Sequence, residues 1–332
     1  MVLTGNSQFV ALSVRFLISL RHLLGLPWGR RMFNRRQFST AVFSAFALNA
    51  CGGTTSESAS RSSASPIAEG STIQRAAGGF RFTEGPAADR TGNIFFSDLS
   101  RSRIHRFSVT GNVSTFRSNS GGANGLMFDK QGNLIVCESN NRRVTSISPS
   151  GRVSILADRY LGRRFNSPND LWIDPRGGIY FSDPSLKSQQ TEQDGAHVYY
   201  ISPDRRTVKR VTNDLVNPNG LIGAADGTRL YVADPGAGRT YVYRIDGEAN
   251  LGGRRTVTNR GSDGMTLDGE GNLYITGETG VMVFNTRNRR IATLDVPEIP
   301  TNVTFGGQNR QTLFITAGTG LYTVQMRVRG QA

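Results

Sequence analysis

The sequence predicts an all-β protein built as a single six-bladed β-propeller. Three observations predict it: the composition, a unit that recurs six times, and a strand before the first unit that can complete the last one. The 332 residues include 39 glycines and 12 prolines, with 37% hydrophobic and 19% charged residues. This mixture is too apolar for a disordered chain and too rich in glycine for a helical bundle, but it suits short strands joined by tight turns.

The repeat begins at residue 84 and has the same parts each time. A polar residue leads into a short apolar strand, an Asp/Gly-rich turn follows, and a second apolar strand ends the motif. Successive leading residues stand 40, 45, 50, 44 and 39 positions apart. A period of about 40–50 residues with four short strands per unit is typical of a propeller blade. The leading residues are Glu84, Asn124, Asn169, Asn219, Asp263 and Asn302.

The last unit is one strand short, because only residues 320–327 form a further strand before the sequence stops. Residues 72–80, which precede the first unit, can supply the missing strand by pairing with the last blade. This closure would remove the exposed sheet edges that invite aggregation. We therefore expect one propeller domain over residues 71–330.

The first 51 residues have the features of an export signal. Paired arginines at 35 and 36 precede a short, weakly apolar run, which resembles a twin-arginine signal, and residues 48–51 (Leu-Asn-Ala-Cys) resemble a lipobox. We expect removal of the signal up to Cys51, which would carry the lipid as the first mature residue. The apolar run of residues 39–50 is too short for a transmembrane anchor, which needs about 20 residues. Met32 is a more economical start than Met1.

Residues 52–70 are predicted to be a disordered tether, because residues 52–66 contain no apolar residue larger than alanine except the closing proline. A lipid anchor, a solvated tether and a folded domain are the parts of a lipoprotein. We therefore expect an exported protein, periplasmic or on the cell surface, that is held to the membrane through Cys51. Cys137 then has no disulfide partner, and its apolar surroundings in the sequence predict a buried, unreactive thiol.

The charge does not indicate a nucleic-acid partner. The net charge of +14 includes six arginines in the first 50 residues, and the remainder holds 33 basic and 25 acidic residues, a net charge of +8. These basic residues are scattered, whereas nucleic-acid binders more often gather them in one stripe with aromatic residues. Three histidines and two cysteines almost exclude the tetrahedral zinc classes. We expect a monomer that acts on a small molecule.

The repeat predicts a site at one mouth of the central channel. The first strand of each blade lines that channel, so the six leading residues should converge on its axis. Turn capping explains Asn and Asp at such positions, but it explains poorly that all six are acids or amides. Glu84 and Asp263 among amides, without histidine or thiolate, predict a hard cation such as calcium or magnesium. The cation would also balance the buried carboxylates.

Further residues fall on the same face, because the loops between second and third strands lie there. The longest loop, residues 182–197, is a candidate lid, and His197 beside it is interpreted as structural. Four acids end second strands on this face and suit either a supporting role at the site or simple strand termination. They are Asp98, Glu138, Asp183 and Asp234.

These motifs resemble those of the senescence marker protein/gluconolactonase/luciferin-regenerating family, and within it the bacterial gluconolactonase-like branch. The resemblance covers about residues 82–325, and six tripeptides in order at blade spacing make it specific. The family fold is a six-bladed propeller, in agreement with the repeat count. The motifs are Phe-Thr-Glu84-Gly-Pro, Ala-Asn124-Gly-Leu, Asn-Ser-Pro-Asn169-Asp, Asn-Pro-Asn219-Gly-Leu, Ser-Asp263-Gly-Met and Asn302-Val-Thr-Phe.

The resemblance implies a divalent-metal-dependent hydrolase of sugar lactones or related esters. The implied cation is Ca²⁺, or another such as Mg²⁺, Zn²⁺ or Mn²⁺, and it would polarise the carbonyl and stabilise the oxyanion. Asp263 would act as the base or nucleophile. The chain has no Gly-x-Ser-x-Gly motif, which argues against a serine-hydrolase route. The implied metal ligands are Glu84, Asn169, Asn219 and Asp263.

The resemblance also implies that Asn124 and Asn302 line the pocket and orient substrate hydroxyls. Ser139 stands where many relatives have a pocket-facing histidine, and Ser167 stands where animal members have an arginine. Both differences affect substrate selection rather than the metal, so they argue for a lactone or related ester without singling out gluconolactone. Two alternatives stay open: an organophosphate-type ester hydrolase on the same metal site, and a non-catalytic binding propeller.

Overall fold

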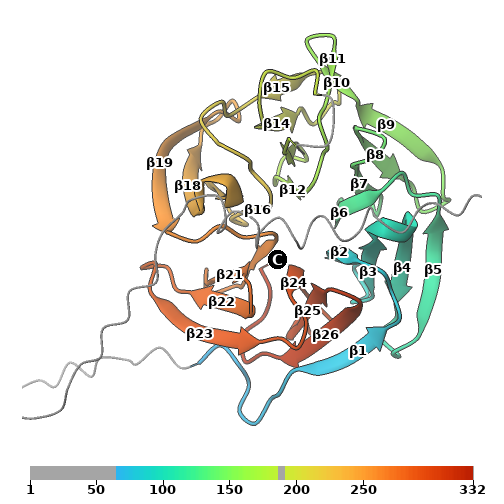
Figure 1. Cartoon of the computed structure of the whole chain (residues 1–332), viewed down its shortest axis with the longest axis vertical. Coiled ribbons are helices and arrows are strands. Elements are labelled where there is room, and N and C mark those ends of the chain that lie inside the picture. The colour runs from blue at the N-terminus through green and yellow to red at the C-terminus, as the bar shows by residue number, and fades with distance from the viewer. Residues whose placement is uncertain (1–64, 186–190, 332) are drawn as a thin grey trace, which may run out of the picture. The chain divides into compact units, whose positions relative to one another are not determined.

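The computed structural model describes residues 65–185 and 191–331, and these form six four-stranded antiparallel sheets arranged in a ring (Figure 1). The all-β, six-bladed propeller predicted from the repeat is therefore confirmed. Strand is the dominant element, and the helices within the described residues are two short 3₁₀ turns. The predicted export signal, Cys51 and residues 52–64 of the predicted tether lie outside the described residues.

In the first five blades the strands follow chain order outward from the ring axis. Blades one to three are β2 (Thr83–Ala88), β3 (Ile94–Asp98), β4 (Arg103–Phe107), β5 (Val113–Ser118); β6 (Ala123–Phe128), β7 (Leu134–Glu138), β8 (Arg143–Ile147), β9 (Val153–Ala157); and β12 (Leu171–Ile173), β13 (Ile179–Asp183), β14 (His197–Ile201), β15 (Val208–Arg210). Blades four and five are β16 (Leu221–Gly223), β17 (Arg229–Asp234), β18 (Arg239–Ile245), β19 (Leu251–Thr258); and β20 (Met265–Leu267), β21 (Leu273–Thr276), β22 (Gly280–Phe284), β23 (Arg290–Asp295). A small hairpin, β10 (Arg159–Tyr160) and β11 (Arg163–Arg164), joins blades two and three.

The sixth blade combines the two ends of the described chain. β24 (Pro300–Gly306), β25 (Thr312–Ala317) and β26 (Gly320–Gln325) are followed by β1 (Gln74–Gly78), which Figure 1 shows outermost beside β26. This is the closing strand that the sequence predicts. Ile67 also pairs with Met326, so residues 66–68, which the sequence assigns to the tether, contact the last blade because Ile67 is apolar and packs on its core.

The core lies between neighbouring sheets. Ile94 and Phe96 of β3, for example, pack with Phe314 and Leu321 of the last blade. Because neighbours cover both faces of each second strand, these strands read as continuous apolar runs rather than as alternating ones. The outermost strands are mostly exposed, as in β5 and β19.

Buried hydroxyl groups connect the blades next to the axis. Ser97 Oγ of blade one donates to the carbonyl oxygen of Asn124 in blade two at 2.8 Å. Thr301 Oγ1 of blade six donates to the carbonyl oxygen of Thr83 in blade one at 2.7 Å. These bonds join neighbouring blades on one face of the ring, where the predicted site lies.

The opposite face carries the turns between first and second strands. In the first of the predicted Asp–x–x–Gly–Asn turns, Asp89 Oδ1 accepts hydrogen bonds from the backbone N–H groups of Thr91 and Asn93, at 2.9 and 3.0 Å. These aspartates therefore serve their own turns. Within the described part of the chain, no helix is long and apolar enough to cross a bilayer.

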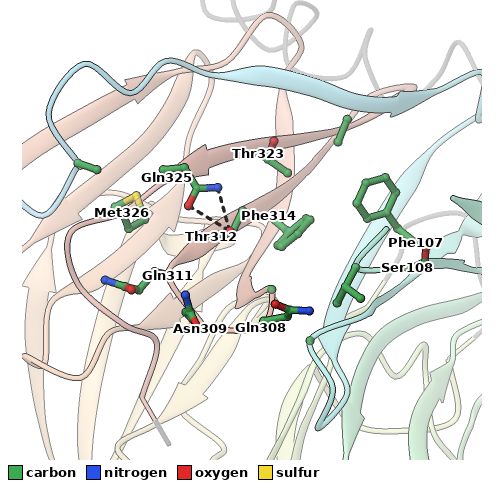
Figure 2. Close-up of a pocket in the computed structure, with 15 residues that line it drawn as sticks. Phe107, Ser108, Gln308, Asn309, Gln311, Thr312, Phe314, Thr323, Gln325 and Met326 are labelled. Carbon is green, nitrogen blue, oxygen red and sulfur yellow. Dashed lines mark hydrogen bonds between the residues drawn. The ribbon is translucent and has the colours of Figure 1, made fainter. Parts of the chain in front are cut away.

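Two cavities open on this opposite face. The larger, about 800 Å³, lies around the axis and extends to Asp170 and Asn302, with Gln331 at its edge. The other, about 550 Å³, lies at the junction of the last and first blades, where Phe314 faces Phe107 across the opening (Figure 2). Its polar lining consists of neutral amides and hydroxyls, whereas the larger cavity reaches the buried carboxylate of Asp170.

Candidate functional site

The predicted site residues stand at the starts of the first strands, which approach one another closely. A Cβ atom at Gly85 would lie 2.0 Å from the carbonyl oxygen of Asn124, and one at Gly264 would lie 2.1 Å from Cγ of Asn302. Gly85 also has a φ of +39°, which side-chain-bearing residues rarely adopt. The glycine that follows Glu84 is therefore required by the packing at the axis.

Four of the predicted residues are joined through their side chains at the axis. Asn219 Nδ2 donates to Asp263 Oδ1 at 2.7 Å. Asn302 Nδ2 donates to Asp170 Oδ2 at 3.4 Å, and the Asn302 amide is close enough to the Glu84 carboxylate to lower its pKa. The structure thus brings together residues from blades one, four, five and six around a carboxylate of blade three.

The other two predicted residues border this group. The carbonyl oxygen of Asn169 accepts a bond from the N–H of Gly125 at 2.7 Å, which places blades two and three side by side at the axis. The Asn124 side chain is buried at the same level. Asn124 Oδ1 has no hydrogen-bond partner in the described part of the chain, whereas Asn302 Oδ1 already accepts from Val303 N at 2.8 Å.

Three carboxyl groups interact electrostatically at the axis: Glu84 and Asp170 are buried, and Asp263 is half-buried. Burial, followed by repulsion from the Asp263 charge, raises the pKa of Glu84 well above its usual value. Burial raises the pKa of Asp263 to about 6, although the Asn219 hydrogen bond opposes the change. Burial likewise raises the pKa of Asp170 to about 7. The raised pKa values mean that ionising all three carboxyls is unfavourable in the metal-free protein, and a bound cation would relieve that cost.

Two buried amide oxygens at the site lack a hydrogen-bond donor among the described residues: Asn124 Oδ1 and Asn219 Oδ1. An unsatisfied buried acceptor costs about 1–3 kcal/mol, so such groups normally have a partner. Amide and carboxylate oxygens are the donors that hard divalent cations prefer, and this donor set fits one. Within residues 65–185 and 191–331 no three Asp, Glu, His or Cys side chains form a metal cluster by themselves, so a cation here would depend on the amides.

Asp170 is the site residue that sequence reasoning missed. Four leading residues are followed by glycine, whereas Asn169 is followed by Asp170, and this break in the pattern is the available signal. The Asp170 carboxylate occupies the space beside Gly125, where a Cβ atom would lie 2.7 Å from Oδ1. Its exposed fraction is 7%, and its Oδ1 accepts from Leu171 N at 2.9 Å.

His197 and Cys137, which the sequence analysis interprets as structural, and Ser139 make their contacts outside the axial group. His197 Nε2 lies 3.0 Å from Asp194 Oδ1 and 3.3 Å from Arg210 Nη1, so its contacts are outside the axial group. Cys137 is fully buried, and burial raises the pKa of its thiol well above the usual value. Ser139 Oγ donates to a backbone carbonyl, that of residue 168, so it supports the loop before Asn169.

Comparisons with known proteins identify relatives of the propeller. The model of the SMP-30/Gluconolactonase/LRE-like region matches residues 82–319, which includes all six leading residues. A gluconolactonase from Zymomonas mobilis is 29% identical over 293 residues, covering 78% of this chain and 82% of that protein. The lactonase drp35 from Staphylococcus haemolyticus is 27% identical over 235 residues, covering 64% of this chain and 69% of the relative.

Solved structures share the fold. A gluconolactonase from Xanthomonas campestris superposes with a TM-score of 0.75 at 29% identity, covering 79% of this chain and 91% of that one. A calcium-binding regucalcin from Agrobacterium tumefaciens has a TM-score of 0.68 at 18% identity, covering 80% and 96%, which is a likeness of fold. Because the family match spans residues 82–319, most of the propeller, this chain belongs to the SMP-30/gluconolactonase/LRE-like family.

Proposed function

We propose that this protein is a divalent-cation-dependent hydrolase of sugar lactones or related esters. The observation that carries the proposal is the axial group of three interacting carboxyls, two of them buried, beside two amide oxygens that have no hydrogen-bond partner among the described residues. The similarity to a gluconolactonase and a lactonase supports the reaction class. The proposed cation is Ca²⁺, with Mg²⁺, Zn²⁺ and Mn²⁺ as alternatives. The residues proposed to hold it are Glu84, Asn169, Asn219 and Asp263.

When bound, the cation would supply polarisation of the substrate carbonyl and compensation of the negative charge that develops on its oxygen. Asp263 is proposed as the base. Its pKa of about 6 leaves it ionised at neutral pH yet basic enough to accept a proton from water. Asn219 holds Oδ1 at 2.7 Å, which fixes the carboxylate and leaves Oδ2 for that proton.

Two amides are proposed to contact the substrate, and the structure supports them unequally. Asn124 has a free buried oxygen that can accept a hydrogen bond from a sugar hydroxyl. The amide of Asn302 is already bonded to Asp170 and to the backbone, so its contribution is to orient the Asp170 carboxylate. Asn124 therefore has the stronger support as a substrate-binding residue.

A lactonase assay with a panel of aldonolactones, followed by proton release with and without chelator, tests the proposal. We expect chelator-sensitive hydrolysis that calcium restores. Asp263→Asn should lower kcat by about 10²- to 10⁴-fold, the usual contribution of a general base, while the protein still binds calcium. Asp268→Asn is the matched control, because Asp268 is buried in a turn on the opposite face.

Each rival function gives a different result in the same experiment. A phosphotriester in the panel that is cleaved while every lactone resists would indicate the organophosphate alternative. Calcium binding without any turnover would indicate a binding propeller. Full turnover by Asp263→Asn would remove the assigned base.

We also propose export and lipid attachment at Cys51. The support is the paired arginines and the Leu-Asn-Ala-Cys run at residues 48–51, together with the low-complexity sequence that follows. Mass spectrometry of the mature N-terminus tests it: a diacylglyceryl cysteine at position 51 is expected. An unprocessed chain would contradict it.

A further inference from the structure

Three aspartates at the ends of second strands make the same pair of hydrogen bonds. Asp98 ends β3, and its two oxygens accept from the backbone N–H groups of Arg81 and Phe82 at 3.1 and 3.2 Å. These two residues stand three and two positions before Glu84. Each carboxylate oxygen accepts one N–H bond, so the carboxylate fixes the backbone segment that leads into a proposed metal ligand.

The same arrangement recurs before Asn169. Asp183 ends β13, and its oxygens accept from Asn166 N at 2.8 Å and from Ser167 N at 2.7 Å. Asn166 and Ser167 again stand three and two positions before the ligand.

It recurs a third time before Asn219. Asp234 ends β17, and its oxygens accept from Val216 N and Asn217 N, both at 2.8 Å. Three blades thus repeat one arrangement with the same spacing, the aspartate device, in which an aspartate at the end of the second strand accepts two backbone N–H bonds. Each time, the two donors precede a residue proposed to bind the cation.

These carboxylates are buried, and burial makes the ionised form of a carboxyl group energetically unfavourable. The exposed fractions are 0% for Asp98, 0% for Asp183 and 1% for Asp234. Asp98 lies 3.5 Å from Arg101, whereas neither Asp183 nor Asp234 forms an ion pair within the described ranges. A buried carboxylate is tolerated only with strong hydrogen-bond donors, which here are the backbone N–H groups of the leading loops.

Within the described residues, blades two and six lack the aspartate device. The leading residues of these two blades are not among the proposed ligands. Glu138 ends β7 but turns to its own blade, where Arg143 Nε donates to it at 2.7 Å. β25 of blade six ends in Ala317. Strand termination alone would not distinguish these blades from the other three.

Blade five supplies Asp263 and holds it differently. Its second strand ends in Thr276, whose hydroxyl oxygen accepts from Gly264 N at 3.0 Å. The Asp263 carboxylate itself is fixed by the Asn219 amide. The aspartate device therefore accompanies the ligands Glu84, Asn169 and Asn219.

We infer that Asp98, Asp183 and Asp234 are positioning residues that set the direction of Glu84, Asn169 and Asn219 toward the ring axis. This inference rests on the proposed function, because it concerns ligands of the proposed cation. An asparagine in place of any of the three would present an NH₂ group to a backbone N–H. One of the two bonds would be lost, and the leading loop would loosen.

The experiment measures calcium affinity by titration calorimetry on the full-length protein and on Asp98→Asn, Asp183→Asn and Asp234→Asn. We expect each substitution to weaken calcium binding about 10- to 100-fold, as for other residues that orient metal ligands. The matched control is Asp268→Asn. Asp268 is 2% exposed and accepts two backbone N–H bonds, from Glu270 and Asn272, in a turn on the opposite face.

The control separates positioning from general stability. All four substitutions should lower the melting temperature, but Asp268→Asn should bind calcium as the unmodified protein does. The inference is overturned if Asp183→Asn and Asp234→Asn fold and bind calcium within about twofold of the unmodified protein. It is also overturned if all three variants fail to fold while Asp268→Asn folds, because the carboxylates would then serve the fold alone.

The same titration distinguishes this inference from the proposed function. Calcium binding that weakens in the three variants, in a protein that hydrolyses no lactone, would support the positioning role and refute the hydrolase. Lactone hydrolysis with unchanged calcium affinity in the variants would do the reverse. If the unmodified protein binds none of Ca²⁺, Mg²⁺, Zn²⁺ and Mn²⁺, both are refuted.

Discussion

Replacing Asp170 by asparagine is expected to stabilise the metal-free protein above pH 7. Burial raises the pKa of Asp170 from 3.8 to about 7. Between these values the folded state keeps a proton that the unfolded state has lost, so stability falls as pH rises through this window. One pKa unit corresponds to about 1.4 kcal/mol, so ionised Asp170 costs the folded protein about 4 kcal/mol above pH 7.

Asparagine removes this charge and preserves part of the local bonding. Its oxygen can still accept from Leu171 N, which is 2.9 Å from Oδ1 of the aspartate. Its NH₂ group would face Asn302 Nδ2, which is 3.4 Å from Oδ2, and that donor pair offsets about 1 kcal/mol. A net gain of about 3 kcal/mol at pH 8 remains, and almost none is expected at pH 4.

The assay is urea denaturation in the presence of chelator at a series of pH values from 4 to 8.5. The difference in unfolding free energy between the two proteins is the relevant quantity, because contributions of other buried carboxyls such as Asp183 are common to both. The difference should grow through the window between 3.8 and about 7. Parallel stability curves, or a variant less stable at pH 8, would refute the reasoning.

Two further predictions concern glycine packing and the buried thiol. Gly264→Ala should lower the unfolding free energy by about 2–3 kcal/mol, because the new Cβ would lie 2.1 Å from Cγ and 2.6 Å from Cα of Asn302. Gly247→Ala, where a Cβ atom meets nothing within 4 Å, is the control, and equal losses in urea denaturation would contradict the packing argument. Cys137 should react with iodoacetamide only after denaturation, because burial raises the pKa of its thiol and blocks access; peptide mapping by mass spectrometry that finds it alkylated in the native protein would contradict this.

The blades could be predicted from the sequence because each is a local unit. Turn residues such as Asp89 and Gly92 mark the hairpins, and the apolar runs between them mark the buried second strands. The closing strand was also predictable, since a ring with one strand missing has one place for residues 72–80. The contact of Ile67 with Met326 was not, because it depends on residues more than 250 positions apart.

The axial residues could be predicted from the repeat, but the individual role of each residue at the site could not. The repeat shows that Glu84, Asn124 and Asn302 occupy equivalent positions, whereas only the structure shows that the Asn302 amide is bonded and the Asn124 oxygen is free. The place of Asp170 in the axial group depends on its packing beside Gly125, whereas the sequence shows only that Asp170 stands where four other leading residues are followed by glycine. The sequence left two interpretations of Asp183 open, a supporting role at the site and simple strand termination. Choosing between them required the hydrogen bond that Asp183 accepts from Asn166 N.

The composite sixth blade dictates an order of assembly. The Arg75 side chain bonds to that of Thr319, 244 positions later, so β1 can pair only after the strands of the sixth blade have been synthesised. Joining chain segments so far apart costs about 5 kcal/mol in loop entropy beyond a constant, whereas the other blades form from consecutive hairpins. We therefore expect the ring to close in the last step of folding, and thermal opening to begin at the seam between β1 and β26.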